Sequence, residues 1–178
     1  MSKTRVVIIE DVSLWLKGLI AYLGKQPDVE IAGDATTVAA AKAIIAAQRP
    51  DVAVIDMAVD RLSGPVLAQE LLRDYPELGI VMLTACDDEQ CIDAMLEIGM
   101  RGLVLKRSES HELLIAVRAA ARGERYVDPS LRSRAAHGSE SRQAAQELLQ
   151  TLSGPEQELC RLLAMGHTNA EVSTMMNV

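Results

Sequence analysis

Five polar side chains whose types suit metal binding and phosphoryl transfer follow short apolar runs in the first part of the chain. In order, they are Glu10, Asp11, Asp56, Thr84 and Lys106. Three carboxylates in one place repel each other, and a hard divalent cation with oxygen ligands relieves that repulsion. Mg²⁺ fits best, because it binds through one or two carboxylates, keeps several waters and accepts phosphate oxygens. An aspartate can attack phosphorus to form an acyl phosphate, and a hydroxyl and a lysine would complete the site.

The elements that position these residues are predicted by apolar runs that alternate with segments of helical spacing. Strands are expected near 5–9, 29–34, 51–55, 79–83 and 102–105. Helices are expected near 12–25, 37–48, 64–75, 88–98 and 110–122. Such alternation predicts an α/β fold with a doubly wound parallel sheet and helices on both faces. Because ligands bind beyond the carboxyl ends of the strands in these sheets, the five side chains should meet in one pocket.

The order of these residues resembles the receiver domain of two-component response regulators, over residues 3 to about 122. The segment 99–106, Gly-Met-Arg-Gly-Leu-Val-Leu-Lys, is similar to the one that leads to that family's lysine. The resemblance implies a flavodoxin-like fold of five βα units, with Asp56 as the phosphoryl acceptor. It also implies that four residues hold Mg²⁺, directly or through water: Glu10, Asp11, Asp56 and Ala58, the last through its backbone carbonyl.

The same resemblance implies how the phosphoryl group would act. A sensor histidine kinase or a small phosphodonor would supply it, Thr84 would close on it and Lys106 would pair with it. Gly64 matches the family's glycine beyond the acceptor loop. The added charge would then shift a pre-existing equilibrium toward a homodimer or a form with a released effector domain. The chain is expected to be a signalling module and not an enzyme, since no motif points to an external metabolite.

Two departures from the family pattern leave a second hypothesis open. Asp60 stands where the family usually has proline, which frees the backbone and adds negative charge near the acceptor. Leu103 stands where the family usually has the Tyr or Phe that rotates inward when the threonine moves. A pseudo-receiver that acts through protein contacts alone is therefore the alternative. Cys86, two residues after Thr84, is a candidate for altering how water reaches an acyl phosphate.

After the predicted receiver at 1–123, the regular alternation of apolar runs and helical segments ends. Residues 124–150 are expected to form a linker with a helical segment, and 151–178 resemble the start of a LuxR-type helix-turn-helix domain. This combination is similar to the NarL/FixJ class of DNA-binding response regulators. The family's recognition helix would follow Val178, so we expect the full-length parent, but not this chain, to bind DNA specifically. Residues 123–178 hold five Arg and no Lys against seven acidic residues, a net charge of −2, which is not a basic surface.

Several other classes of protein lose support. Neither GxGxxG after the first strand nor GxxxxGK[ST] is present, which disfavours a nucleotide-binding scaffold. Three Cys and three His are scattered without a CxxC pair, which disfavours a structural zinc site. There is no apolar run near eighteen residues and no signal-peptide pattern, so we expect a cytoplasmic protein without a membrane contact. Taken singly, each strand-end Asp or Thr could still be a helix N-cap, and Lys106 a solvated charge.

Overall fold

The computed structural model describes residues 3–59, 62–85, 92 and 95–131. They belong to one compact unit, Met1–Ala135. Some residues and segments that the sequence analysis discusses lie outside the described residues: Asp60, Cys86, the part of the linker beyond Leu131, and the unit at 151–178. The described residues thus cover most of the predicted receiver.

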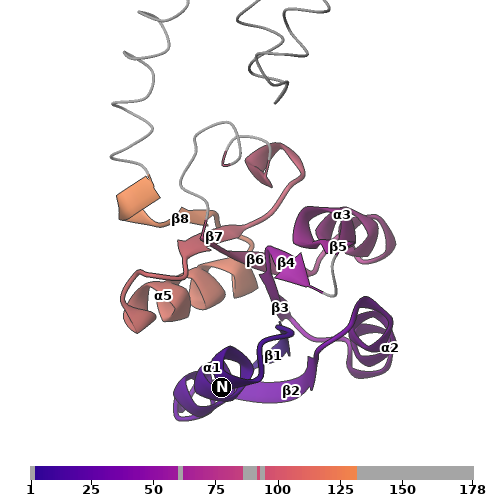
Figure 1. Cartoon of the computed structure of the whole chain (residues 1–178), viewed down its shortest axis with the longest axis horizontal. Coiled ribbons are helices and arrows are strands. Elements are labelled where there is room, and N and C mark those ends of the chain that lie inside the picture. The colour runs from indigo at the N-terminus through magenta and orange to yellow at the C-terminus, as the bar shows by residue number, and fades with distance from the viewer. Residues whose placement is uncertain (1–2, 60–61, 86–91, 93–94, 132–178) are drawn as a thin grey trace, which may run out of the picture. The chain divides into compact units, whose positions relative to one another are not determined.

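A six-stranded parallel sheet forms the centre of this unit, with the strand order β2-β1-β3-β6-β7-β8 (Figure 1). Its strands are β1 (Thr4–Ile9), β2 (Val29–Ala35), β3 (Val52–Asp56), β6 (Gly79–Thr84), β7 (Gly102–Leu105) and β8 (Tyr126–Val127). A short antiparallel pair, β4 (Ala58–Val59) with β5 (Leu62–Ser63), follows β3. The strand order reverses between β1 and β3, as in a doubly wound sheet. The predicted flavodoxin-like α/β fold is confirmed.

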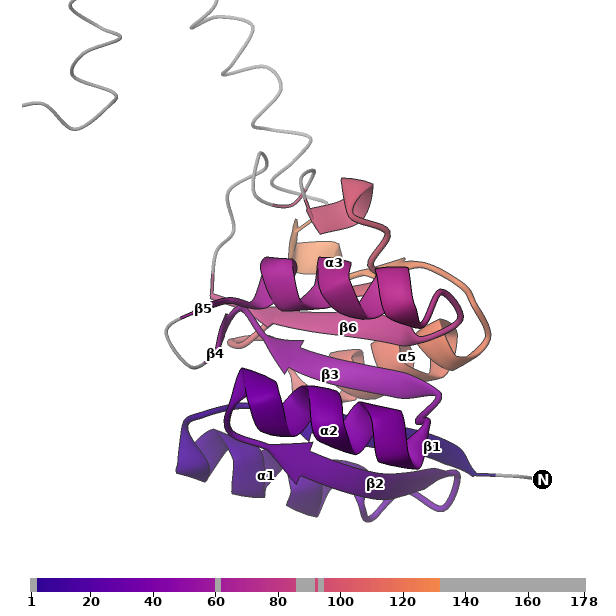
Figure 2. The ribbon, with the colours of Figure 1, turned by 90° about the vertical axis from the view of Figure 1, so that its right-hand side faces the viewer.

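Helices cover both faces of the sheet, and Figure 2 shows α2 and α3 in front of it with α1 and α5 behind. Their bounds are α1 (Ser13–Leu23), α2 (Val38–Gln48), α3 (Gly64–Asp74) and α5 (Ser110–Ala121). Of the helix expected at 88–98, the described residues 92 and 95–97 are helical. Among the described residues, no helix is long and apolar enough to cross a membrane.

Alternate residues of each strand pack into two separate cores, one on each face of the sheet. On the α1/α5 face, Val54, Val81 and Val104 are buried together. On the α2/α3 face, Ile55 and Met82 are buried together. Aliphatic side chains fill both cores, and methionines add to the core of the α2/α3 face. This alternation decides on which face each side chain at the strand ends lies.

The sixth strand corrects one expectation. We predicted a receiver ending at 123 followed by a linker, but Tyr126 and Val127 pair in parallel with Gly102 and Leu103 of β7. Beyond this strand Asp128 is 1% exposed and Leu131 is fully buried. The polar sequence misled because the buried Asp128 carboxylate accepts backbone hydrogen bonds in place of water. The receiver therefore continues at least through Leu131.

Candidate functional site

The carboxyl edge of the sheet gathers the five predicted site residues. Glu10 and Asp11 follow β1, and Lys106 follows β7, while Asp56 and Thr84 are the last residues of β3 and β6. Neighbouring strands are in matching register there, since Asp56 pairs with Leu83 and Thr84 pairs with Leu105. Parallel pairing thus brings residues nearly a hundred positions apart to one place.

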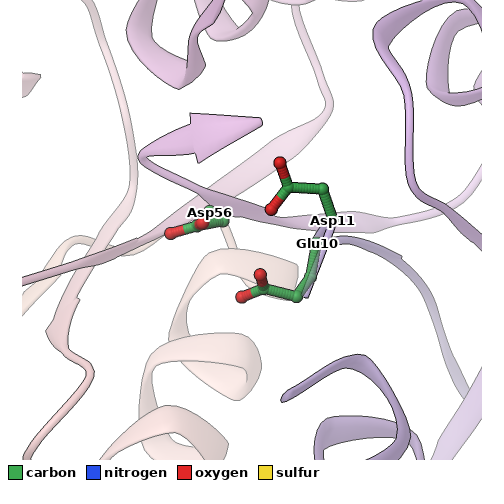
Figure 3. A group of neighbouring side chains, drawn as sticks. All are labelled: Glu10, Asp11 and Asp56. Atoms are coloured by element: carbon green, nitrogen blue, oxygen red, sulfur yellow. The ribbon is translucent and has the colours of Figure 1, made fainter. Parts of the chain in front are cut away.

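Three carboxylates form a cluster in which one oxygen of each lies within 4.8 Å of the others: Glu10, Asp11 and Asp56 (Figure 3). Glu10 is fully buried and Asp56 is 5% exposed, whereas Asp11 is exposed. The backbone N–H of Val12 donates to Glu10 Oε1 at 3.0 Å and fixes that side chain. Buried carboxylates need compensating charge, so this oxygen cluster, open to solvent at Asp11, is compatible with Mg²⁺.

Lys106 supplies positive charge to the same cluster. Its Nζ lies 2.9 Å from Glu10 Oε2 and 2.8 Å from Asp56 Oδ1. Partial burial alone would lower the pKa of Lys106, but the hydrogen bonds to Asp56 and Glu10 outweigh it and hold that pKa above its ordinary value. The ammonium group is therefore charged at neutral pH and bridges the two buried carboxylates.

Trp15 is a neighbour of this lysine that the sequence predictions missed. The Lys106 Nζ lies 5.4 Å from the centroid of the Trp15 ring, close enough for a cation–π contact. Both residues line an apolar pocket of about 540 Å³ between α1 and α5, whose walls include Leu19, Tyr22 and Leu113. The sequence places Trp15 on the helix expected at 12–25, but nothing in its spacing indicates that the ring reaches Lys106.

Thr84 lies on the other face of the sheet from the lysine. It is fully buried, and its hydroxyl donates a hydrogen bond to the sulfur of Met57 at 2.9 Å. Its backbone carbonyl accepts from the N–H of Lys106 at 2.8 Å, which ties the strand ends together. Met57 was not predicted as a site residue, although it directly follows Asp56 and continues the register that faces Thr84.

The loop after Asp56 is held by backbone contacts on both sides. The N–H of Met57 donates to Leu83 O at 2.9 Å, and its carbonyl accepts from Gly64 N at 2.8 Å. A Cβ on Gly64 would lie 2.3 Å from the carbonyl oxygen of Asp56, so only glycine permits this approach. Ala58, the predicted backbone ligand, is exposed at the start of β4, two residues from Asp56.

Leu103, at the position of the family's switching aromatic, is fully buried in the core of the α2/α3 face. It pairs in register with Met82, two residues before Thr84 on β6. Its side chain occupies the inward position and has no ring that could reach the surface. Leu103 therefore lies on the strand next to β6, two positions along the register from the pair of Thr84 with Leu105.

Comparisons with known proteins agree with this geometry. A family model of the response regulator receiver domain matches residues 6–118. The DNA-binding transcriptional activator DevR/DosR of Mycobacterium tuberculosis is 35% identical over 175 residues, which cover 97% of this chain and 79% of that protein. The transcriptional regulatory protein LiaR of Bacillus subtilis is 30% identical over 172 residues, covering 94% of this chain and 80% of that protein.

A solved structure supports the same assignment. The signal receiver domain of the response regulator NarL from Mycobacterium tuberculosis is similar with a TM-score of 0.65 and 30% sequence identity. The match covers 70% of this chain and the whole of that chain. The fold, the acidic edge and the relatives lead to one assignment: the chain belongs to the two-component response regulators of the NarL/FixJ class.

Proposed function

We propose that this protein receives a phosphoryl group on Asp56, with the help of Mg²⁺, and passes on a signal through the change in charge. The observation that supports this most is the pairing of Lys106 with both Glu10 and Asp56 beside Asp11. An oxygen of Asp56 would form a bond to phosphorus while the bond to the donor breaks, and the donor would leave with the electron pair. The product is an acyl phosphate.

The other groups of the site have separate roles in this proposal. Mg²⁺ would neutralise charge on the phosphoryl oxygens, held by the carboxylates and a backbone carbonyl: Glu10, Asp11, Asp56 and Ala58. Lys106 already contacts Asp56, and would exchange that carboxylate oxygen for a phosphoryl oxygen. Thr84, at the end of the adjacent strand, would donate its hydroxyl to another phosphoryl oxygen. The protein would accept phosphate as a regulator and would not act as an enzyme on a metabolite.

The partners follow from this chemistry and from the relatives. A sensor histidine kinase would be the phosphodonor, and phosphorylation would favour a homodimer by shifting an existing equilibrium. Because DevR/DosR is named as DNA-binding, we extend DNA binding to the full-length parent of this chain.

A second candidate, a pseudo-receiver that signals without phosphorylation, is favoured by one observation. Leu103 is fully buried and aliphatic, so the site lacks the aromatic movement that the family uses for relay. In that case the carboxylates would serve stability and the surface would serve binding. Metal binding and phosphorylation separate the two candidates directly.

Mg²⁺ binding can be measured through the fluorescence of Trp15, which is the chain's single tryptophan and lies 5.4 Å from Lys106 Nζ. Mg²⁺ should change its emission, because the cation competes with the ammonium for the same carboxylates. Asp56→Asn should weaken Mg²⁺ binding at least about tenfold, since a charged ligand is lost. Asp74→Asn, an exposed aspartate on α3 paired with Arg73, is the matched control and should bind as the wild type does.

Phosphorylation is then tested with acetyl phosphate and intact mass measurement, and its consequence with beryllofluoride and light scattering. One added phosphoryl group on the wild type and on Asp74→Asn, but not on Asp56→Asn, would establish the acceptor. Mg²⁺ binding without any phosphoryl gain would favour the pseudo-receiver. A phosphoryl gain without any change in mass or shape would mean that the chemistry operates and the relay through Leu103 does not.

A further inference from the structure

The contact between Thr84 and Met57 connects the proposed phosphoryl chemistry to a residue that is not among the five predicted site residues. The Thr84 hydroxyl donates to Met57 Sδ at 2.9 Å, inside the edge of the α2/α3 core. Asp56 pairs in register with Leu83, so the next residues on the two strands, Met57 and Thr84, lie side by side beyond that pair. The sulfur that accepts the hydroxyl therefore belongs to the residue bonded directly to Asp56.

Two hydrogen bonds restrain the backbone of Met57 and so fix where its side chain begins. Its N–H donates to Leu83 O and its carbonyl accepts from Gly64 N, at 2.9 and 2.8 Å. The side chain is partly buried and packs against the core of the α2/α3 face. Thr84 is equally restrained, being fully buried at the end of β6. The backbones of Met57 and Thr84 are thus fixed by hydrogen bonds and burial, so the contact can break only through a change in side-chain conformation.

A hydroxyl has one proton and donates to one acceptor at a time. While Thr84 donates to the Met57 sulfur, it cannot donate to a phosphoryl oxygen on Asp56. Closure on the phosphoryl group therefore requires this hydrogen bond to break. A thioether is a weak acceptor, so the exchange for a charged phosphoryl oxygen is favourable but not free of cost.

We propose that Met57 is a positioning residue that holds the Thr84 hydroxyl in the unphosphorylated form and so sets how readily the site closes. This inference rests on the proposed function, because it needs Thr84 to close on a phosphoryl group. Met57, the residue after the proposed acceptor Asp56, would thereby stabilise the unphosphorylated form. The sulfur acts through Thr84 and touches no reacting atom.

Substitutions at Met57 separate the hydrogen bond from simple packing. Met57→Leu keeps the apolar bulk and removes the acceptor, so the resting form loses one weak hydrogen bond. Binding of beryllofluoride with Mg²⁺, followed by Trp15 fluorescence, should become about two- to five-fold tighter. Met57→Gln has a similar length and offers an amide oxygen as acceptor, so it should not tighten binding. Met100→Leu, a fully buried methionine before β7 at the opposite end of that strand from Lys106, is the matched control and should bind as the wild type does.

A double-mutant cycle tests the route through Thr84. In a Thr84→Val background, which has no hydroxyl to release, Met57→Leu should leave the beryllofluoride affinity unchanged within about 1.5-fold, as expected when the shared partner is gone. Tighter binding by Met57→Leu in both backgrounds, or by Leu and Gln alike, would overturn the proposal in favour of packing. Equal binding by wild type and Met57→Leu would overturn it as well. If the wild type itself failed to bind beryllofluoride while binding Mg²⁺, the proposed phosphoryl chemistry would be the part that fails.

Discussion

The two faces of the sheet differ sharply at the functional edge. On the α1/α5 face, strand alternation places Glu10, Asp56 and Lys106, which are joined by two charged contacts of 2.9 and 2.8 Å. On the α2/α3 face lie Thr84 and Leu103, which are neutral and fully buried. One face thus holds concentrated charge, and the other holds apolar packing that includes a weak hydroxyl contact to sulfur.

This division separates two tasks. Charged groups at short distances respond strongly to a cation or a phosphoryl group, because electrostatic energies are large where water is excluded. Neutral side chains in a packed core respond through volume and position instead. We therefore expect substitutions on the charged face to change Mg²⁺ affinity most, and substitutions on the neutral face to change stability with little effect on the metal.

The largest loss of stability is expected from Leu103→Ala on the neutral face. Leu103 is fully buried, so the truncation removes apolar contacts and leaves a cavity, at about 3 kcal/mol in the free energy of unfolding. Mg²⁺ affinity should stay within about twofold of the wild type, because Leu103 lies in the apolar core and is not one of the proposed metal ligands. Urea unfolding and Trp15 fluorescence measure the two quantities on the same samples.

Leu71→Ala is the matched control for this substitution. Leu71 lies on α3 in the same core and is 2% exposed, so it should lose a similar amount of stability. The control shows how much of any change at Leu103 belongs to lost volume alone. A tenfold change in Mg²⁺ affinity for Leu103→Ala, but not for Leu71→Ala, would show that the two faces are not separable.

Lys106→Met should give a smaller loss of stability and a larger change at the metal. Methionine keeps the length of the side chain but leaves the buried Glu10 and Asp56 carboxylates without their cation. We expect a loss of about 2 kcal/mol without Mg²⁺, below the roughly 3–5 kcal/mol for a broken pair that is fully buried, since Asp11 keeps the site open to solvent. Mg²⁺ should restore much of that stability and bind more tightly, because the ammonium no longer competes.

The control for Lys106→Met removes a lysine from an exposed pair. Lys42 Nζ lies 2.6 Å from Glu70 Oε2, with both side chains well exposed, so Lys42→Met should change stability by less than about 1 kcal/mol. Its Mg²⁺ affinity should be that of the wild type. If Mg²⁺ stabilised Lys42→Met and Lys106→Met equally, the cation would not be replacing the ammonium group at the carboxylates.

The sequence was a good guide to features that depend on local pattern. Five strands of the six-stranded sheet and the helices α1, α2, α3 and α5 followed from periodicity, and the five site residues followed from their places after apolar runs. Three features depended on tertiary register and were not predictable. The two-residue strand β8 exists through its pairing with β7 and the burial of Asp128. The contact of Met57 with Thr84 follows from the β3–β6 register, and that of Trp15 with Lys106 from the packing of α1.

Asp128 offers the smallest but most selective test, because it fixes the strand end that both faces share. Its Oδ2 accepts the N–H of Leu105 at 3.3 Å and its Oδ1 accepts the N–H of Ser130 at 2.9 Å. Leu105 belongs to the neutral core, and the next residue, Lys106, reaches the carboxylates. Asp128→Asn should cost about 1 kcal/mol, since an amide presents one acceptor atom where two are used. It should also weaken Mg²⁺ binding slightly, unlike Leu103→Ala.

The pH dependence of the unfolding free energy tests whether the charge of Asp128 causes the loss of stability expected for Asp128→Asn. Burial alone would raise the pKa of Asp128, but the hydrogen bonds that it accepts outweigh burial and hold that pKa below its ordinary value of 3.8. A lowered carboxyl pKa contributes stability above pH 3.8 that is lost as the pH falls through the folded-state value. The difference in unfolding free energy between wild type and Asp128→Asn should therefore be constant near neutral pH and shrink below pH 3.8. A difference that persisted unchanged to the lowest pH would assign the effect to side-chain shape, and the shared strand end would then be held by packing instead of by charge.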